Sequence, residues 1–401
     1  MEKKLILPNN LNPFLLAILF ITAADSIGTI GPFYLIVRLI IFSLLFYIVL
    51  YKKFISIPLL IGVALITLSL VIHTIMIPSS IKINFRPAMN ILHPFILYII
   101  FSNIDNKSNI FSLNNAIIFL RISYIAIFLS LILGHLTGLG DTIGSRGAIE
   151  GLGGFFIGKN EIGIILIMVV IFAYWIKDHI SRIELFFIMF CTMVLGIAVF
   201  TKSAMIASLI AFIFLDSKII KTFLIVASLI AVIRLLPKIM GLIDFLYNET
   251  FFSAIEDGII EFLFRGRTRY IDAFFNGLDF RFDQIIELLF IGFGNHFISY
   301  QIINNYAIFK GAIFKDFEMD YLDLFFGFGL LFTLFYTFYL IKLLIRIGKY
   351  SNWKISFLLL FIVLHAIMAG HVFFSTQVIN IVIIFFFFVK YNYYNSIAKE
   401  D

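Results

Sequence analysis

Charged residues are scarce in this chain of 401 residues, since Asp, Glu, Lys and Arg together make up only 13% of it. Hydrophobic residues make up 62%, and the mean hydropathy is +1.06. The surface of a soluble globular protein carries more charge than this composition supplies. The scarcity of charge therefore argues against a soluble domain and indicates a polytopic integral membrane protein.

Cysteine is nearly absent as well, because Cys191 is the only one. One cysteine within an apolar run excludes both an intrachain disulfide framework and a cysteine-based metal site. The sequence also has no evident internal repeat, which argues against a secondary transporter. No small-residue cleavage site follows the charged start at Met1, so we expect the first apolar stretch to be a span rather than a cleavable signal peptide.

Long apolar runs, in contrast, are abundant. Runs of about 18 to 22 apolar residues have the length that an α-helix needs to cross about 30 Å of hydrocarbon. Outer-membrane strands would be about ten residues long and would alternate polar with apolar residues, so helices are expected. The runs predict an all-α membrane protein with about twelve spans, centred near residues 18, 41, 66, 94, 125, 167, 191, 209, 227, 331, 361 and 380.

The distribution of Lys and Arg predicts the orientation of these spans. Most basic residues, from Lys3 and Lys4 through Lys52 and Lys53 to Lys390, fall at span ends on one side, which the positive-inside rule assigns to the cytoplasm. Alternation through about twelve spans then places both termini in the cytoplasm. Topology alone explains the formal net charge of +6, so we do not expect nucleic-acid binding.

The predicted spans divide the chain into three parts. Residues 1–236 form an N-terminal transmembrane bundle of about nine spans, residues 237–318 a large extracytoplasmic loop, and residues 319–401 a C-terminal bundle of about three spans with a cytoplasmic tail. The loop is rich in charged residues, and such groups near a bilayer usually serve a function. Its stretches near residues 244–264 and 283–291 mix apolar with acidic residues, which suits interfacial helices.

A glycine-rich segment on the predicted external side is the first candidate site. Residues 144–158 hold Arg146 and lead into a helix that starts with Lys159, Asn160 and Glu161. A helix N-terminus with a lysine beside it suits an anion such as phosphate, and Glu161 would then be paired or act as a base. The alternatives are a surface loop with a capping Asn and an arginine that snorkels to lipid phosphates.

Two further basic clusters face the same compartment. Lys202 lies in the turn 201–204 between two apolar runs, where a snorkelling span end is the alternative role. On an extended segment, Arg265, Arg267 and Arg269 would project to one side. Guanidinium groups make bidentate bonds to phosphate oxygens, so the three together could hold a diphosphate. Attachment to anionic lipid headgroups is the alternative.

Acidic residues and histidines complete the candidates. Glu318 and Asp320 suit the dipole of a helix that starts there, whereas Asp323 would lie one turn inside the span. An ionisable residue at that depth normally faces a cavity or a partner. His296 follows a Gly-x-Gly segment of the loop, and His371 lies at the external end of the last predicted hairpin, where histidines are more often structural than catalytic.

The order of these motifs resembles a known family. An Arg-Gly loop that leads into Lys-Asn, a Thr-Lys-Ser-Ala hairpin, a large external loop that ends in Gly-x-Gly, and an acidic Asp-Tyr-Leu span start look like the Wzy-type polysaccharide polymerases of the O-antigen polymerase and ligase superfamily. The resemblance covers about residues 140–375. Ligase relatives usually carry a His-Asn pair where this chain has Met319 and Asp320, which favours a polymerase. A GT-C-like helical fold is what the resemblance implies.

The resemblance also implies a reaction, namely inverting glycosyl transfer outside the cytoplasmic membrane. A growing glycan leaves its undecaprenyl diphosphate and joins a new lipid-linked repeat unit, without a metal or another cofactor. A flippase and a chain-length regulator are the implied protein partners. The candidates for diphosphate binding are Arg146, Lys202, Arg265, Arg267 and Arg269, and those for the base are Asp320 or Glu161, then His296 or His371.

Two rival functions remain open at this stage. A surface-polysaccharide ligase has the same topology and leaving group, and only its acceptor differs. A lipid-linked oligosaccharide flippase or exporter would line a central cavity with arginines from span interiors. Only Arg38 and Arg121 lie well inside apparent spans, which makes the flippase the weaker rival.

Overall fold

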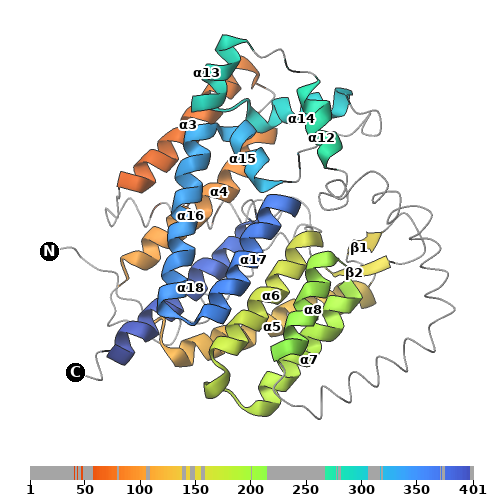
Figure 1. Ribbon diagram of the computed structural model, residues 1–401, viewed down its shortest axis with the longest axis vertical. Helices are drawn as coiled ribbons and strands as arrows, with labels where there is room; N and C mark the ends of the chain where they lie inside the picture. The colour runs from red at the N-terminus through yellow and green to blue at the C-terminus, as the bar shows by residue number, and fades with distance from the viewer. Residues whose placement is uncertain are drawn as a thin grey trace.

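The computed structural model describes about two thirds of the chain. The described residues are 40, 43, 47, 57–78, 81–104, 109–137, 141–144, 150–154, 159–199, 201–214, 267–276, 278, 281–305, 317, 319–370, 372 and 375–397. They form a mainly helical fold, as the composition predicts, and the N-terminal half of the described chain lies beside the C-terminal half (Figure 1).

The helices fall into two groups along the sequence. The first contains α3 (Ile57–Met76), α4 (Ile81–Ser102), α5 (Leu113–Leu136), α6 (Lys159–Trp175), the short 3-10 helix η4 (Lys177–His179), α7 (Arg182–Val199) and α8 (Lys202–Phe214). The second contains α12 (Thr268–Phe275), α13 (Phe282–Phe290), α14 (Gly294–Asn305), α15 (Asp320–Phe328), α16 (Leu330–Tyr350), α17 (Trp353–Ala369) and α18 (Thr376–Ile397).

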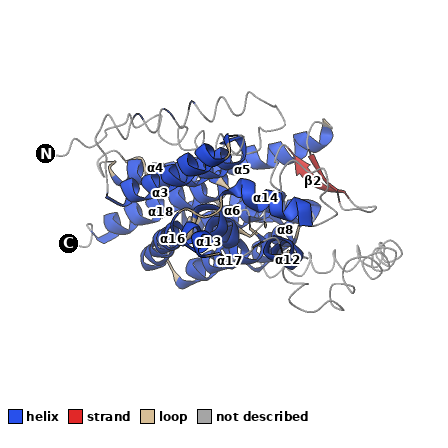
Figure 2. Cartoon of the chain, turned by 90° about the horizontal axis from the view of Figure 1, so that it is seen from above, coloured by secondary structure: helices blue, strands red, loops and turns tan. Residues whose placement is uncertain are grey.

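The described residues confirm the all-α class and add one small sheet that the sequence did not predict. Strands β1 (Asp141–Gly144) and β2 (Glu150–Gly154) pair antiparallel, with Asp141 opposite Gly154 and Gly144 opposite Glu150. This hairpin lies at one edge of the helices (Figure 2), and β2 contacts α5 and α7. The sequence predicts a loop here because its glycines conceal any strand pattern.

Four described helices are long and apolar enough to cross a membrane: Leu113–Leu136, Arg182–Val199, Leu330–Tyr350 and Gln377–Ile397. Shorter apolar helices of 10–17 residues cover Leu60–Met76, Glu161–Trp175, Ser203–Phe214 and Lys354–Ile367. The predicted centres near residues 66, 94, 125, 167, 191, 209, 361 and 380 fall within described helices, whereas those near 18, 41 and 227 lie outside the described residues.

The span predicted around residue 331 needs a correction. Gly329 has a φ of +88° and separates α15 from α16, so the long apolar helix begins at Leu330. The segment from Asp320 to Phe328 is a separate nine-residue helix. Hydropathy misses this break because apolar residues continue on both sides of it. Asp323 therefore lies in a short helix ahead of the span and not one turn inside it.

The core of the bundle is formed around α6 and α18. Every residue given a burial value from Ile162 to Ala173 is buried, as is the stretch from Gln377 to Val389. The ring of Phe172 lies 5.2 Å from that of Phe385 (centroid to centroid), so the last turn of α6 lies beside the middle of α18. Both helices run downward in Figure 1, so the first turns of α6 and α18 lie towards the same end of the bundle.

Helices α12 to α15 form a lobe at that end, the upper end in Figure 1. The lobe has its own core of buried residues: Phe274, Phe293, Ile298, Ile302, Phe317, Met319 and Phe326. In α13, five apolar residues remain exposed: Phe282, Ile285, Ile286, Leu289 and Phe290. Their spacing places them on one helix face, as the predicted interfacial helix near residues 283–291 requires. The other predicted interfacial stretch, 244–264, lies outside the described residues.

Candidate functional site

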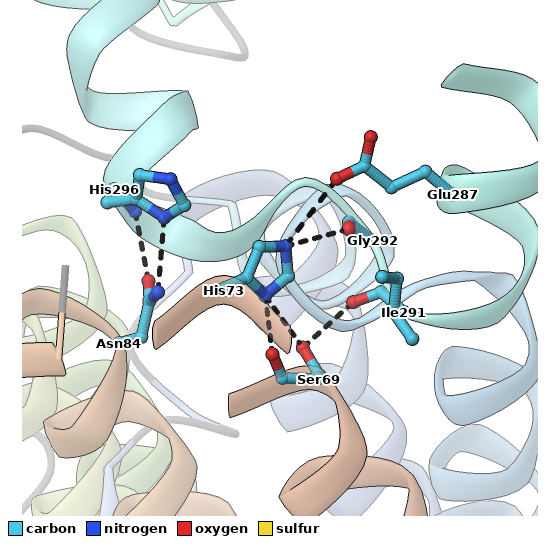
Figure 3. Close-up of polar contacts among 7 residues, drawn as sticks. All are labelled: Ser69, His73, Asn84, Glu287, Ile291, Gly292 and His296. Atoms are coloured by element: carbon cyan, nitrogen blue, oxygen red, sulfur yellow. Dashed lines mark hydrogen bonds and ion pairs between the residues drawn. The ribbon is translucent and has the colours of Figure 1, made fainter. Parts of the chain in front are cut away.

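A polar cluster joins the lobe to the bundle (Figure 3). It brings Ser69 and His73, near the end of α3, against the segment between α13 and α14. The Ser69 hydroxyl donates to the carbonyl oxygen of Ile291 at 2.8 Å, and the His73 Nε2 lies 3.1 Å from the carbonyl oxygen of Gly292. These contacts satisfy two carbonyl groups that no helix pairs, and they fix the α13–α14 connection on α3.

Both ring nitrogens of His73 face backbone acceptors. Its Nδ1 lies 2.7 Å from the carbonyl oxygen of Ser69, while Nε2 faces Gly292. A neutral imidazole carries one N–H and satisfies one of these carbonyls, whereas an imidazolium donates to both. Glu287 supplies a counter-charge for the imidazolium form, because its Oε1 lies 3.8 Å from the His73 Nε2. Burial, together with Asp283, raises the pKa of Glu287.

His296 is held in a defined tautomer by Asn84 of α4. The Asn84 Oδ1 accepts the backbone N–H of His296 at 3.0 Å, which directs Nδ2 towards the His296 Nδ1 at 3.1 Å. Since an amide nitrogen only donates, Nδ1 is the acceptor and the ring proton lies on Nε2. Burial and, secondarily, His73 lower the pKa of His296 to about 4. The ring is therefore neutral at pH 7 and offers a hydrogen-bond donor rather than a strong base.

The glycines of this region permit backbone-to-backbone contact. Gly292 and Gly294 have φ values of +69° and +75°, which disfavour any other residue. A Cβ on Gly292 would lie 2.6 Å from the amide nitrogen of Gly329, and a Cβ on Gly329 would lie 2.8 Å from that of Gly292. The Phe293 N–H also donates to the carbonyl oxygen of Phe326 at 2.6 Å. The predicted Gly-x-Gly segment is thus where the lobe crosses the α15–α16 break.

Asp320 and Asp323 have different surroundings at the start of α15, although both are buried. The Asp323 carboxylate accepts the backbone N–H groups of Phe317 at 3.0 Å and Met319 at 3.1 Å, so it stabilises the turn that leads into the helix. The Asp320 Oδ2 accepts the backbone N–H of Val372 at 2.7 Å. Asp320 therefore lies beside the connection between α17 and α18 that contains Val372. The candidate His371 precedes Val372 in sequence, but it lies outside the described residues.

Helix α6, which carries Glu161 in its first turn, meets the turn at residues 201–204 that holds Lys202. Glu161 is buried with 6% of its surface exposed, in the first turn of α6. A Cβ on Gly163, two residues later, would lie 2.1 Å from the Ser203 Oγ, so α6 and α8 are in contact at their first turns. Thr201 caps α8 by accepting the backbone N–H of Ala204 at 3.2 Å. The structure therefore brings together two motifs that lie 40 residues apart in sequence.

The extended arrangement predicted for the arginine cluster is wrong. Arg267 is the residue that precedes α12 and has helical backbone angles, and Arg269 lies within that helix. The Arg267 side chain is buried with 3% exposed, whereas Arg269 is exposed. The two guanidinium groups therefore do not share one face. The sequence pattern suggested a strand because alternate residues are basic, but Tyr270 to Phe275 continue a helix.

Several predicted site residues cannot be compared with this geometry. Arg146, Arg265 and His371 lie outside the described residues, and for Lys202 only the backbone is described, at the start of α8. Within the described part of the chain, no group of three or more His, Cys, Asp or Glu side chains is arranged to hold a metal ion.

Sequence reasoning missed His73 and Asn84, which the structure places beside His296, and Glu287, which it places beside His73. His73 carries a detectable signal, since it is a histidine near the end of an apolar run. Asn84 and Glu287 carry none, because an amide after a short turn and a carboxylate in an amphipathic helix are ordinary surface residues. Their roles depend on contacts between residues more than 200 positions apart.

Comparisons with known proteins add no relative. A scan against protein-family models, a search of the curated proteins and a search of the solved structures each found no match to this chain. The family resemblance of the motifs therefore stays a prediction.

Proposed function

We propose that this protein is a bacterial polysaccharide polymerase, which joins lipid-linked oligosaccharide repeat units into O-antigen or capsule by inverting glycosyl transfer. One arrangement supports this proposal most. Glu161, Arg267 and Asp320 come from distant parts of the sequence, yet all three are buried at the lobe end of an apolar helix bundle. Buried ionisable groups in such a place are costly and are typical of a site for a polar substrate.

The donor in this proposal is a glycan on undecaprenyl diphosphate. Departure of the sugar develops negative charge on the diphosphate, and fixed cations stabilise that transition state more than the ground state. We assign this role to Arg267 first, because a buried guanidinium is already desolvated and acts in a low dielectric. Arg146, Lys202, Arg265 and Arg269 remain further candidates for the same role.

The acceptor in this proposal is a sugar hydroxyl that needs a base. Asp320 is our first choice and Glu161 the second, because both carboxylates are buried near helix starts at the lobe end. The neutral His296 suits hydrogen bonding to a sugar better than proton abstraction, given its donor at Nε2. The amphipathic α13 would hold this site at the depth of the lipid headgroups.

The proposed function also requires a particular membrane topology. About twelve spans cross the cytoplasmic membrane, both termini are cytoplasmic, and the lobe is extracytoplasmic. A flippase that delivers the lipid-linked substrate and a chain-length regulator are the proposed partners. The bidentate pair of Arg121 with Glu184, at 2.7 and 2.6 Å, argues against a flippase role for the protein itself. Arg121 is half exposed and its charge is already neutralised by Glu184, whereas Arg38 lies outside the described residues.

The test is complementation of a deletion strain, read as the length distribution of its surface glycans on a gel. We expect loss of the long ladder and survival of a single-repeat band in the deletion. Asp320→Asn and Arg267→Ala should fail to restore the ladder, with at least about 100-fold less polymer. Arg267→Lys should restore little if a bidentate contact matters.

A matched pair of control variants lies in the same lobe. Arg281→Ala and Asp283→Asn remove exposed groups, whose side chains pair with each other at 3.5 Å, and both should restore the full ladder. Wild-type chain length in Asp320→Asn and Arg267→Ala at equal membrane abundance would overturn the proposed roles. Loss of all attached glycan, with polymer still on its lipid carrier, would instead assign a ligase.

A further inference from the structure

An apolar groove lies between α4, α16 and α18, away from the lobe. Its walls are formed by Pro94, Phe95, Tyr98, Tyr336, Tyr339, Leu340, Leu343, Ile379 and Ile383, with Lys342 and Arg346 at one end. Ring contacts of Phe95 with Tyr336 and of Tyr98 with Phe387 hold the three helices together around it. None of the described residues that line the groove is acidic. Its walls therefore suit a hydrocarbon chain and its basic end an anion.

The basic end lies next to the last turns of α16 and α18. Arg346 donates from Nη1 to the Tyr98 hydroxyl at 3.2 Å, which uses one of its five donors. Lys390 of α18 lies beyond the groove walls, and ring contacts of Tyr350 with Tyr393 and Tyr394, at 5.1 and 5.6 Å, bring its part of α18 beside the end of α16 that carries Arg346. Among the described residues, neither forms an ion pair with a carboxylate. Two neighbouring cations without a counter-charge favour a bound anion.

The depth of the groove agrees with one leaflet of a bilayer. Tyr336 and Arg346 both line it and are ten residues apart, or about 15 Å along an α-helix. That is half of the roughly 30 Å of hydrocarbon in a bilayer. The aromatic residues Tyr350, Tyr393 and Tyr394 follow at the basic end, as in an interfacial belt.

We propose that this groove binds an anionic phospholipid, with an acyl chain between α4, α16 and α18 and the phosphate on Arg346 and Lys390. The positive-inside prediction places this lipid in the cytoplasmic leaflet, where anionic lipids create a negative surface potential. A free phosphate would use the same cations but would leave the apolar walls uncovered. The proposal depends on a membrane position for these helices and not on the polymerase function.

The test is native mass spectrometry of the full-length protein in detergent, with phosphatidylglycerol and phosphatidylcholine of equal chain length as competing probes. We expect the wild-type protein to retain one phosphatidylglycerol in preference to phosphatidylcholine. Arg346→Gln with Lys390→Gln should weaken that retention about thirtyfold, since each cation near a headgroup contributes about 1 kcal/mol. Inorganic phosphate and the deacylated headgroup should bind far more weakly than the intact lipid.

The control removes the same two residue types elsewhere. Lys349 and Arg182 are exposed and lie away from the groove walls, so Lys349→Gln with Arg182→Gln should leave retention unchanged. Equal loss in both double variants, unaltered retention in Arg346→Gln with Lys390→Gln, or equal binding of the deacylated headgroup would each overturn the proposal. The monodisperse peak and the melting temperature without lipid verify folding.

A second variant tests the apolar part alone. Leu343→Trp adds bulk to the groove wall without a change of charge, and it should reduce phosphatidylglycerol retention at least tenfold. A photoreactive cross-linker at position 339, used in the absence of lipid, would reveal whether residues 1–56 fill the groove instead. A cross-link from position 339 to that segment, together with no retained lipid in the wild type, would overturn the proposal.

Discussion

The central helices and the lobe are both well buried, but different interactions hold them in place. In α6 and α18, apolar side chains cover every face, and the rings of Phe172, Phe385 and Phe388 pack in several orientations. The lobe helices have only eight to twelve residues each. A small aromatic core, close glycine contacts and side-chain bonds to backbone carbonyls hold them on the bundle.

This difference affects how each region responds to change. Apolar packing tolerates volume-conserving substitutions, because neighbouring side chains repack around them. A backbone crossing has no such freedom, since the atoms nearest to Gly292 and Gly329 belong to the main chain. We therefore expect the lobe to depend on a few individual contacts, and the bundle to depend on the sum of many weak ones.

Gly292→Ala should have the largest effect. Its new Cβ would lie 2.6 Å from the Gly329 amide nitrogen, in a backbone with a φ of +69°. The strain and the displacement together should cost about 3–5 kcal/mol in the free energy of unfolding. Thermal unfolding of the purified protein measures it. Gly62→Ala is the control, because its Cβ would meet only the Phe335 ring edge at 3.1 Å. Equal melting temperatures for Gly292→Ala and Gly62→Ala would contradict the close backbone contact between Gly292 and Gly329.

Phe274→Ala tests whether the lobe has a separate core. Phe274 is fully buried and contacts Phe317 and Phe326, with ring centroids at 5.0 and 4.8 Å. Its truncation should cost about 3 kcal/mol locally and expose residues 267–305 to protease, while the bundle stays folded. Phe172→Ala in α6 is the counterpart, and it should lower the stability of the whole bundle. Identical protease patterns would show a single cooperative unit.

Acidification should weaken the attachment of the lobe selectively. Burial lowers the pKa of His296 from 6.5 to about 4, so the unfolded chain binds a proton in that interval and the folded chain does not. The contribution of the neutral His296 ring to the free energy of unfolding is therefore complete above about pH 6.5, and it declines as the pH falls towards about 4. In His296→Gln, the melting temperature should depend less on pH between those two values than it does in the wild type. An unchanged pH profile would contradict the buried neutral ring.

The smallest effect should come from the Arg121–Glu184 pair. Arg121 is 49% exposed and its partner Glu184 lies in the first turn of α7, at the predicted cytoplasmic end, where a pair that water reaches contributes about 0.5 kcal/mol. A double-mutant cycle with Arg121→Gln and Glu184→Gln measures this coupling energy through thermal unfolding. A coupling above about 2 kcal/mol would mean that the pair is desolvated, contrary to its exposure.

Hydropathy predicted the helices of the bundle well, because a long apolar run is a local property of the sequence. It missed the break at Gly329, since Phe328 and Leu330 continue the apolar pattern across it. It also missed the hairpin over residues 141–154, where glycines provide no alternation of polar and apolar side chains.

Sequence reasoning named candidate residues from motifs but could not describe their surroundings. Glu161, Arg267 and Asp320 were named from motifs, and the structure buries all three. The tautomer of His296 and the contacts of His73 could not be predicted. Both depend on residues more than 200 positions away, and one sequence carries no record of such pairs.

The central position of α18 constrains the order of assembly. Its apolar window is 72% buried, against 33–44% for the other three candidate spans. Ribosomes synthesise chains from the N-terminus, so α18 is the last of the described helices to enter the membrane. The earlier helices must then leave a space between α4 and α6 until it arrives. Final closure of the bundle thus waits for α18, and the insertion machinery or lipids must shield the open space until this helix enters.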